Sequence, residues 1–146
     1  MPDEMKLNAI KNTSLLVVWR SEYNLGIPII DEQHRGIVTA INSLYYGMQN
    51  KYTKIILAPI ADMVSNYTHI HFGIEEAFLE KYNFAGIQHH RQLHKELIDT
   101  LFKVRQESTW NQDPSHFLEF LKRWWIDHIC DKDRVFRDYL FKNPDL

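Results

Sequence analysis

Histidine and acidic residues recur in this sequence at spacings that suit metal binding. His71 and Glu75 are four residues apart, and so are His90 and His94. Two residues at this spacing lie about 40° apart around an α-helix, so both side chains can contact one ion from adjacent turns. Imidazole and carboxylate groups are ligands of transition-metal ions. Each pair is therefore predicted to supply part of a metal site.

Two more histidines, His34 and His128, share the apolar stripes of expected helices with these four residues. A neutral polar group that is buried without a partner costs about 2–7 kcal/mol. A single core histidine can bond to a neighbour, but five histidines and a carboxylate would leave donors and acceptors unmatched. We therefore predict that the six side chains converge on bound metal.

Asp133 is a seventh candidate and lies five residues after His128. Five residues correspond to roughly 140° around a regular helix, so both side chains meet one site only with a strained reach or a local π-type turn. We expect such a distortion or a strained reach between residues 128 and 133. The alternative is that Asp133 is a surface acid within the charged segment DKDRVFRD.

The elements that must position these residues are helices, since four stretches carry apolar residues three and four positions apart. Pro59 is expected to open the second helix rather than to kink a longer one that starts near Thr53. The segment NFAG (83–86) is a short connection, and ESTWNQDPS (107–115) breaks the third stripe. The expected stripes run from Asp31, as N-cap, to Met48, from Ile60 to Tyr82, from Ile87 to Val104 and from Phe117 to His128.

Four amphipathic helices with mostly short links predict an all-α fold, an antiparallel up-down four-helix bundle. Residues 1–30 lack helical periodicity and are expected to form an extended arm that lies on the bundle of residues 31–140. The length of 146 residues suits one domain, residues 1–146.

Composition narrows the class of protein. A hydrophobic content of 45%, a charged content of 25% and a net charge of −2 are typical of soluble proteins and give no reason to expect nucleic acid or an anionic membrane. The run SLLVVW (14–19) is too short for a signal sequence or for direct membrane insertion. The single cysteine, Cys130, cannot form an intrachain disulfide, so we expect a cytoplasmic protein.

The segments WRSEYNLGIPIIDEQHRG, HIHFGIEEAFL, GIQHHRQLHKEL and WWIDHICDKDRVFRDYL resemble the bacterial hemerythrins over residues 19–140. The shared signature is a lone histidine after an acidic start, followed by HxxxE, HxxxH and HxxxxD. This resemblance implies a non-haem centre of two iron ions with a solvent-derived oxo or hydroxo bridge and with dioxygen as its ligand. It implies one iron on His90, His94 and His128, the other on His34 and His71, and Glu75 and Asp133 bridging both.

Counting bonds shows why such a ligand set suits dioxygen. Five imidazoles, two bridging carboxylates and a bridging oxygen supply eleven bonds, and two octahedra need twelve. The open position then belongs to the iron of His34 and His71. Ferritin-like oxidases use paired ExxH segments and zinc hydrolases use HExxH, and the sequence contains neither motif.

We therefore expect a binding protein rather than an enzyme, a soluble carrier or store of dioxygen that could supply an oxygen-consuming enzyme, and a monomer. The alternatives are a stand-alone sensor of dioxygen, iron or redox state, and a di-iron enzyme acting on peroxide or nitric oxide. His69 and His89 are expected to point away from the site. The residues expected to line and dry the dioxygen pocket are Trp125, Trp124, Phe72, Ile37 and Val38.

Overall fold

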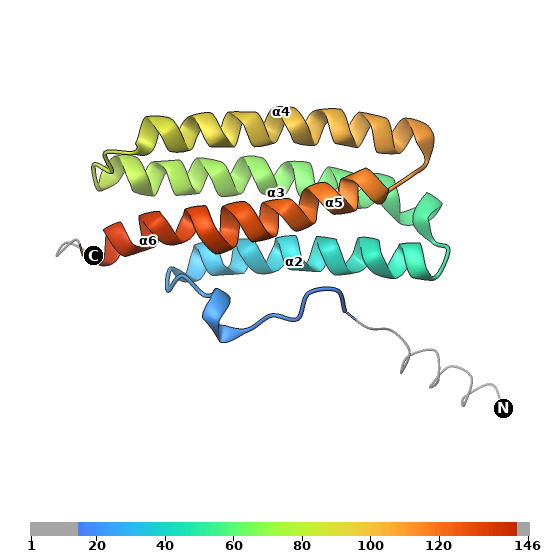
Figure 1. Cartoon of the computed structure of the whole chain (residues 1–146), viewed down its shortest axis with the longest axis horizontal. Helices are drawn as coiled ribbons and strands as arrows, with labels where there is room; N and C mark the ends of the chain where they lie inside the picture. Colours follow the sequence, from blue (N-terminus) through green and yellow to red (C-terminus); the bar gives the residue numbers. More distant parts are fainter. Residues whose placement is uncertain (1–14, 143–146) are drawn as a thin grey trace.

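Four antiparallel helices form the molecule in the computed structural model (Figure 1), which describes residues 15–142 apart from the side chains of Trp125, Ile126, Lys132 and Phe136. The fourth helix is continuous and has three parts, of which the middle one is π-helical. The prediction of an all-α four-helix bundle is confirmed. The elements are η1 (Ser21–Tyr23), α2 (Pro28–Gln49), α3 (Thr53–Lys81), α4 (Ile87–Asn111) and the fourth helix, made of α5 (Ser115–Arg123), η2 (Trp124–Lys132) and α6 (Asp133–Phe141).

Helix α2 starts four residues earlier than the sequence predicts. Ile27 is its N-cap, and Pro28 occupies the first turn, where a missing N–H costs nothing. Asp31 is therefore not the N-cap. Its carboxylate accepts hydrogen bonds from the backbone N–H groups of Leu25, at 2.7 Å, and Gly26, at 3.1 Å, and so holds the end of the arm against the helix.

Pro59 lies inside α3, so the prediction that it opens the helix is wrong and the longer helix from Thr53 is correct. Proline removes one helical hydrogen bond. The neighbouring residues Leu57, Ile60 and Ala61 are buried in the core, and this burial offsets the lost bond.

The predicted break after Val104 is also misplaced. Helix α4 continues through Trp110, which is 89% exposed, and ends where Gln112 adopts a left-handed conformation. The apolar pattern of α4 stops after Val104 because most side chains of its last turns are not buried in the core. The backbone nevertheless stays helical to Asn111.

Helices α2 and α3 pack closely because glycine lies at their contact. A Cβ atom on Gly36 would lie 2.6 Å from the ring of Tyr67, and one on Gly47 would overlap the side chain of Ile56. The apolar core that these helices share with α4 and the fourth helix includes Ile41, Leu44, Val64, Leu101, Phe117 and Leu121.

The described part of the predicted arm, up to Ile27, lies along the bundle, while residues 1–14 are outside the described residues. The side chain of Asn42 on α2 forms two hydrogen bonds with the backbone of the arm. Its Oδ1 accepts from the N–H of Val17 at 2.9 Å, and its Nδ2 donates to the carbonyl of Val17 at 2.8 Å. The guanidinium of Arg35 stacks 4.7 Å over the ring of Trp19.

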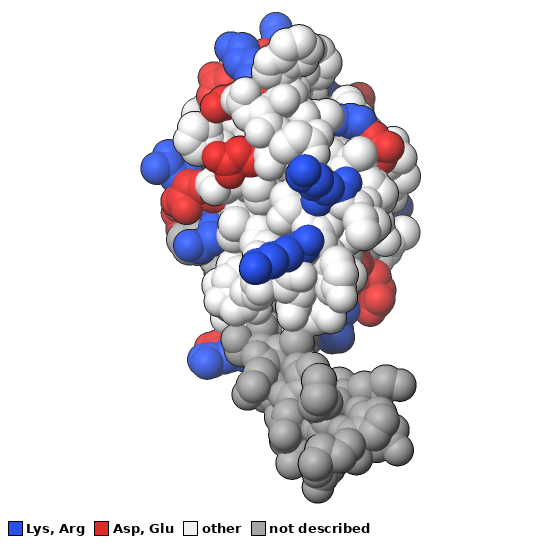
Figure 2. Space-filling view, turned by 90° about the vertical axis from the view of Figure 1, so that its right-hand side faces the viewer, with Lys and Arg blue, Asp and Glu red and all other residues white. Residues whose placement is uncertain are grey.

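Charge is unevenly spread over the surface. Figure 2 views the end where α2 joins α3 and α4 joins α5, and it shows basic side chains near the centre of a largely uncharged face, with acidic groups toward the rim. The stretch of residues 33–61, which includes the α2–α3 connection, contains no acidic residue. In the described residues, no helix combines the length and apolar character needed to cross a bilayer.

Candidate metal centre

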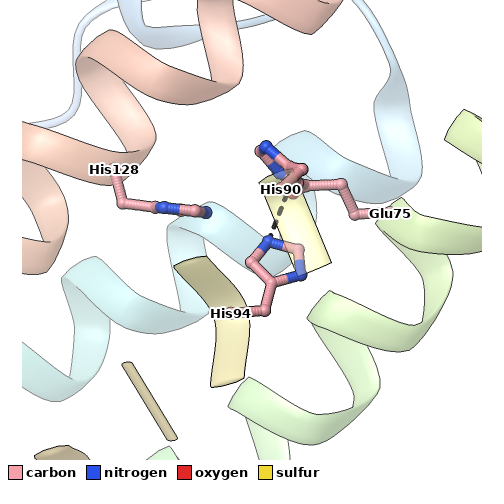
Figure 3. A group of neighbouring side chains, drawn as sticks. All are labelled: Glu75, His90, His94 and His128. Atoms are coloured by element: carbon pink, nitrogen blue, oxygen red, sulfur yellow. Dashed lines mark hydrogen bonds and ion pairs between the residues drawn. The ribbon is translucent and has the colours of Figure 1, made fainter. Parts of the chain in front are cut away.

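The seven side chains predicted from the sequence lie together between the four helices. His34 comes from α2, and His71 and Glu75 come from α3. Helix α4 supplies His90 and His94, and the fourth helix supplies His128 and Asp133. Figure 3 shows His90, His94 and His128 facing one another, with Glu75 reaching toward them from α3. All seven are buried, and the most exposed of them, His90, is only 5% exposed.

The π-helical segment η2 brings His128 and Asp133 to one face of their helix. The N–H of Asp133 donates to the carbonyl of His128, a bond between residues five apart. Nε2 of His128 then lies 3.2 Å from Oδ1 of Asp133. The predicted distortion between residues 128 and 133 is confirmed.

The two oxygens of Glu75 face different histidines. Its Oε1 contacts Nε2 of His90 and lies 3.3 Å from Nε2 of His94. Its Oε2 lies 3.1 Å from Nε2 of His71. One carboxylate therefore reaches two separate groups of imidazoles.

Asp133 divides its oxygens in the same way. Its Oδ1 is 3.2 Å from Nε2 of His128 and 3.7 Å from Nε2 of His90. Its Oδ2 is 3.2 Å from Nε2 of His34 and 3.8 Å from Nε2 of His71. The donors thus form a three-histidine group (His90, His94 and His128) and a two-histidine group (His34 and His71), with both carboxylates between them.

Several of these buried atoms have no hydrogen-bond partner among the described residues. They are Nε2 of His94, Nε2 of His128, Oε2 of Glu75 and both oxygens of Asp133. A buried polar atom without a partner is costly, and coordinated cations would satisfy these atoms. Two sets of donors, each lying within 4.8 Å of one another, are able to hold a metal ion: Glu75 with the three-histidine group, and Glu75 and Asp133 with the two-histidine group. The residues present therefore fit a pair of metal ions.

The buried acids and imidazoles of the site shift one another's pKa values. Burial opposes the charged form of His71, but the nearby carboxylates of Asp133 and Glu75 raise its pKa to about 9. Burial acts to raise the pKa of Glu75, yet the nearby imidazoles of His71, His90 and His94 hold it well below its usual range. Burial lowers the pKa of His128 to about 4, which favours the neutral ring that binds metal.

Two residues outside the donor set orient its imidazoles. Nδ1 of His71 lies 2.8 Å from the side-chain oxygen of Gln33, and Nδ1 of His94 lies 2.8 Å from Oε1 of Glu76. Each oxygen accepts a hydrogen bond, so the Nε2 lone pair of each ring is directed into the site. Neither residue was predicted from the sequence. Their only signal is position, since Gln33 precedes His34 and Glu76 follows Glu75.

Apolar side chains enclose the cluster. The ring of Phe72 stacks on His94 with centroids 3.7 Å apart and meets Trp124 edge-on at 5.6 Å. Trp124 and His128 border a pocket of about 320 Å³ between α4 and the fourth helix. Ile37 and Val38 are buried in the same core. The prediction for Trp125 falls outside the described side chains.

The remaining histidines do not join the centre. His69 and His89 are exposed, as predicted. His116 is exposed and pairs with Glu107, their side chains 2.8 Å apart. Cys130 is half-buried, and burial raises the pKa of its thiol.

Comparison with known proteins agrees with this arrangement. Residues 25–140 match the family described as the hemerythrin HHE cation binding domain. A bacteriohemerythrin of Stenotrophomonas maltophilia is 31% identical over 84% of this chain and 80% of its own length, and one of Clostridium acetobutylicum is 30% identical over 84% of this chain and all of its own. A hemerythrin of Sipunculus nudus is 27% identical over 84% of this chain and 92% of its own length. The chain belongs to the hemerythrin family.

Proposed function

We propose that this protein binds dioxygen reversibly at a non-haem centre of two iron ions with a solvent-derived bridge. The observation that carries this proposal is the division of both carboxylates, since each of Glu75 and Asp133 presents one oxygen to each histidine group. A single ion would leave half of these oxygens unused. Family membership and the mixed imidazole and carboxylate donors support iron as the metal.

The proposed ligand set follows the two groups. His90, His94 and His128 would hold one iron, His34 and His71 the other, and both carboxylates would bridge them. When bound, the iron pair supplies the electrons and the open coordination position that reversible dioxygen binding needs. Because one group has fewer imidazoles, we infer that the open position lies on the side of His34 and His71.

The role of the surrounding chain is to keep the ligands oriented and the site dry. Gln33 and Glu76 hold His71 and His94 with Nε2 toward the metals. We propose that Phe72, Trp124, Ile37 and Val38 exclude water, which would slow irreversible oxidation, and that Trp125 shares this role. The first four of these side chains are buried. The proposed biological role is that of a carrier or store.

Anaerobic loading with ferrous iron tests this function. After desalting, we expect two irons per chain and a visible band that develops in air and fades on degassing through repeated cycles. His69→Ala is the matched control for His71→Ala, because His69 is an exposed histidine on the same helix. The control variant should behave as the parent protein, whereas His71→Ala should lose iron. Immediate and irreversible oxidation of the parent protein would contradict the carrier role.

A further inference from the structure

The outer partners of the two histidine groups differ in charge. His94, in the three-histidine group, donates to the carboxylate of Glu76. His71, in the two-histidine group, donates to the neutral amide oxygen of Gln33. Both bonds are 2.8 Å long, so the groups differ here in the charge of the acceptor and not in the length of the bond.

A charged acceptor changes what an imidazole offers a metal. A carboxylate that accepts the Nδ1 proton increases the electron density on Nε2 and makes the ring a stronger ligand, more so than an amide. A stronger ligand near a negative charge favours the ferric over the ferrous state. The effect in this protein is moderated, because the Glu76 side chain is 28% exposed and Nε of Arg91 lies 3.7 Å from its Oε2.

Arg91 does not neutralise this effect completely. It also pairs with Glu80, with NH2 of Arg91 3.2 Å from Oε2 of Glu80. One cation is thus shared between two acids, and the trio of Glu76, Glu80 and Arg91 keeps a net negative charge beside His94. Gln33 is buried and uncharged.

We propose that Glu76 makes the two metal positions unequal, so that the three-histidine position stabilises the ferric state more strongly and is the first to be oxidised. This inference rests on the proposed function and deepens it. Glu76 is a positioning residue that acts through His94. Its charge would make the two-histidine position the second to lose an electron.

The test is a potentiometric titration of the iron-loaded protein, in which each step transfers one electron from iron to an electrode through a mediator. Glu76→Gln keeps a hydrogen-bond acceptor and removes the charge. It should shift the first oxidation equilibrium about tenfold toward the ferrous state, which equals about 59 mV for a one-electron couple. Glu76→Asp should restore most of the parent potential.

Glu80→Gln is the matched control, because it removes the same charge from a residue that also contacts Arg91 but not a site histidine. It should shift the first potential by less than about a third of the shift that Glu76→Gln causes. Gln33→Glu places the charge on the other group and should lower the second potential while leaving the first nearly unchanged. It therefore tests the inference even if Glu76→Gln loads iron poorly.

The outcomes separate the two proposals. If both variants load two irons and Glu76→Gln shifts the first potential no more than Glu80→Gln does, this inference is overturned, since a general surface charge would then explain the potentials. The proposed function would remain intact. An unchanged second potential in Gln33→Glu would also overturn it. A parent protein that retains no iron would overturn the proposed function and this inference together.

Discussion

The backbone N–H of Asp133 donates to the carbonyl of His128, five residues earlier, and this single bond defines where the second carboxylate of the centre lies. A regular helix would bond Asp133 to residue 129 and turn its side chain away from His128. The wider turn places the two side chains on one face and buries Asp133 completely. A rare backbone form is thus found where the proposed site requires it.

Removal of the Asp133 carboxylate should reduce the metal content. Asp133→Ala takes one oxygen from each histidine group, so we expect fewer than two irons per chain after anaerobic loading and desalting. Asp131→Ala makes the same chemical change at an exposed position two residues away and should retain two. Metal analysis of both variants checks this, and equal iron contents would exclude Asp133 as a ligand.

Metal binding should stabilise the fold, and this stabilisation should depend on His90 but not on the adjacent His89. Ferrous iron at a concentration 100 times its dissociation constant should add about 2.7 kcal/mol to the free energy of unfolding. His90→Ala should lose most of this gain, because His90 is buried against Glu75, whereas His89→Ala should keep it, because His89 is exposed. Anaerobic thermal melts with and without iron measure the difference. A full gain in His90→Ala would show that this histidine is not a ligand.

Glycine should be required where α2 meets α3. Gly47→Ala would overlap Ile56, so we expect it to lower the free energy of unfolding by about 1–2 kcal/mol despite the better helix propensity of alanine. Gly73→Ala, in the middle of α3 with no atom within 4 Å of the added Cβ, should raise it by about 0.5–1 kcal/mol. Chemical denaturation separates the two cases, and a stabilised Gly47→Ala would show that the helices can move apart freely.

Asn42 should hold the arm in place. Its side chain satisfies both the N–H and the carbonyl of Val17, so Asn42→Ala leaves two backbone groups without protein partners and should cost about 1–3 kcal/mol. We also expect faster tryptic cleavage after Arg20, because the arm then detaches more often. Asn66→Ala, at an exposed position on α3, is the control. If cleavage is equally slow in both variants, Asn42 is not what holds the arm in place.

Three helix ends differ from those that the apolar pattern predicts. Apolar periodicity reports burial, not backbone conformation. It therefore placed the end of α4 too early, where the helix continues through the exposed Trp110, and the start of α3 too late, at Pro59. The early start of α2 was missed because Asp31 is a good N-cap by type, yet its carboxylate binds the preceding arm instead.

The sequence alone predicted that His34, His71, Glu75, His90, His94 and His128 converge, because histidine and carboxylate on apolar stripes have few satisfactory environments other than a metal, and the structure brings them together. The spacing of His128 and Asp133 predicted either a π-type turn or a strained reach if Asp133 joins the site, and the structure has the π-type turn. Tertiary structure decided which oxygen of each carboxylate faces which histidines, and it selected Gln33 and Glu76 as outer partners. These choices depend on how helices distant in sequence are rotated against one another, and side-chain packing across the whole core sets that rotation.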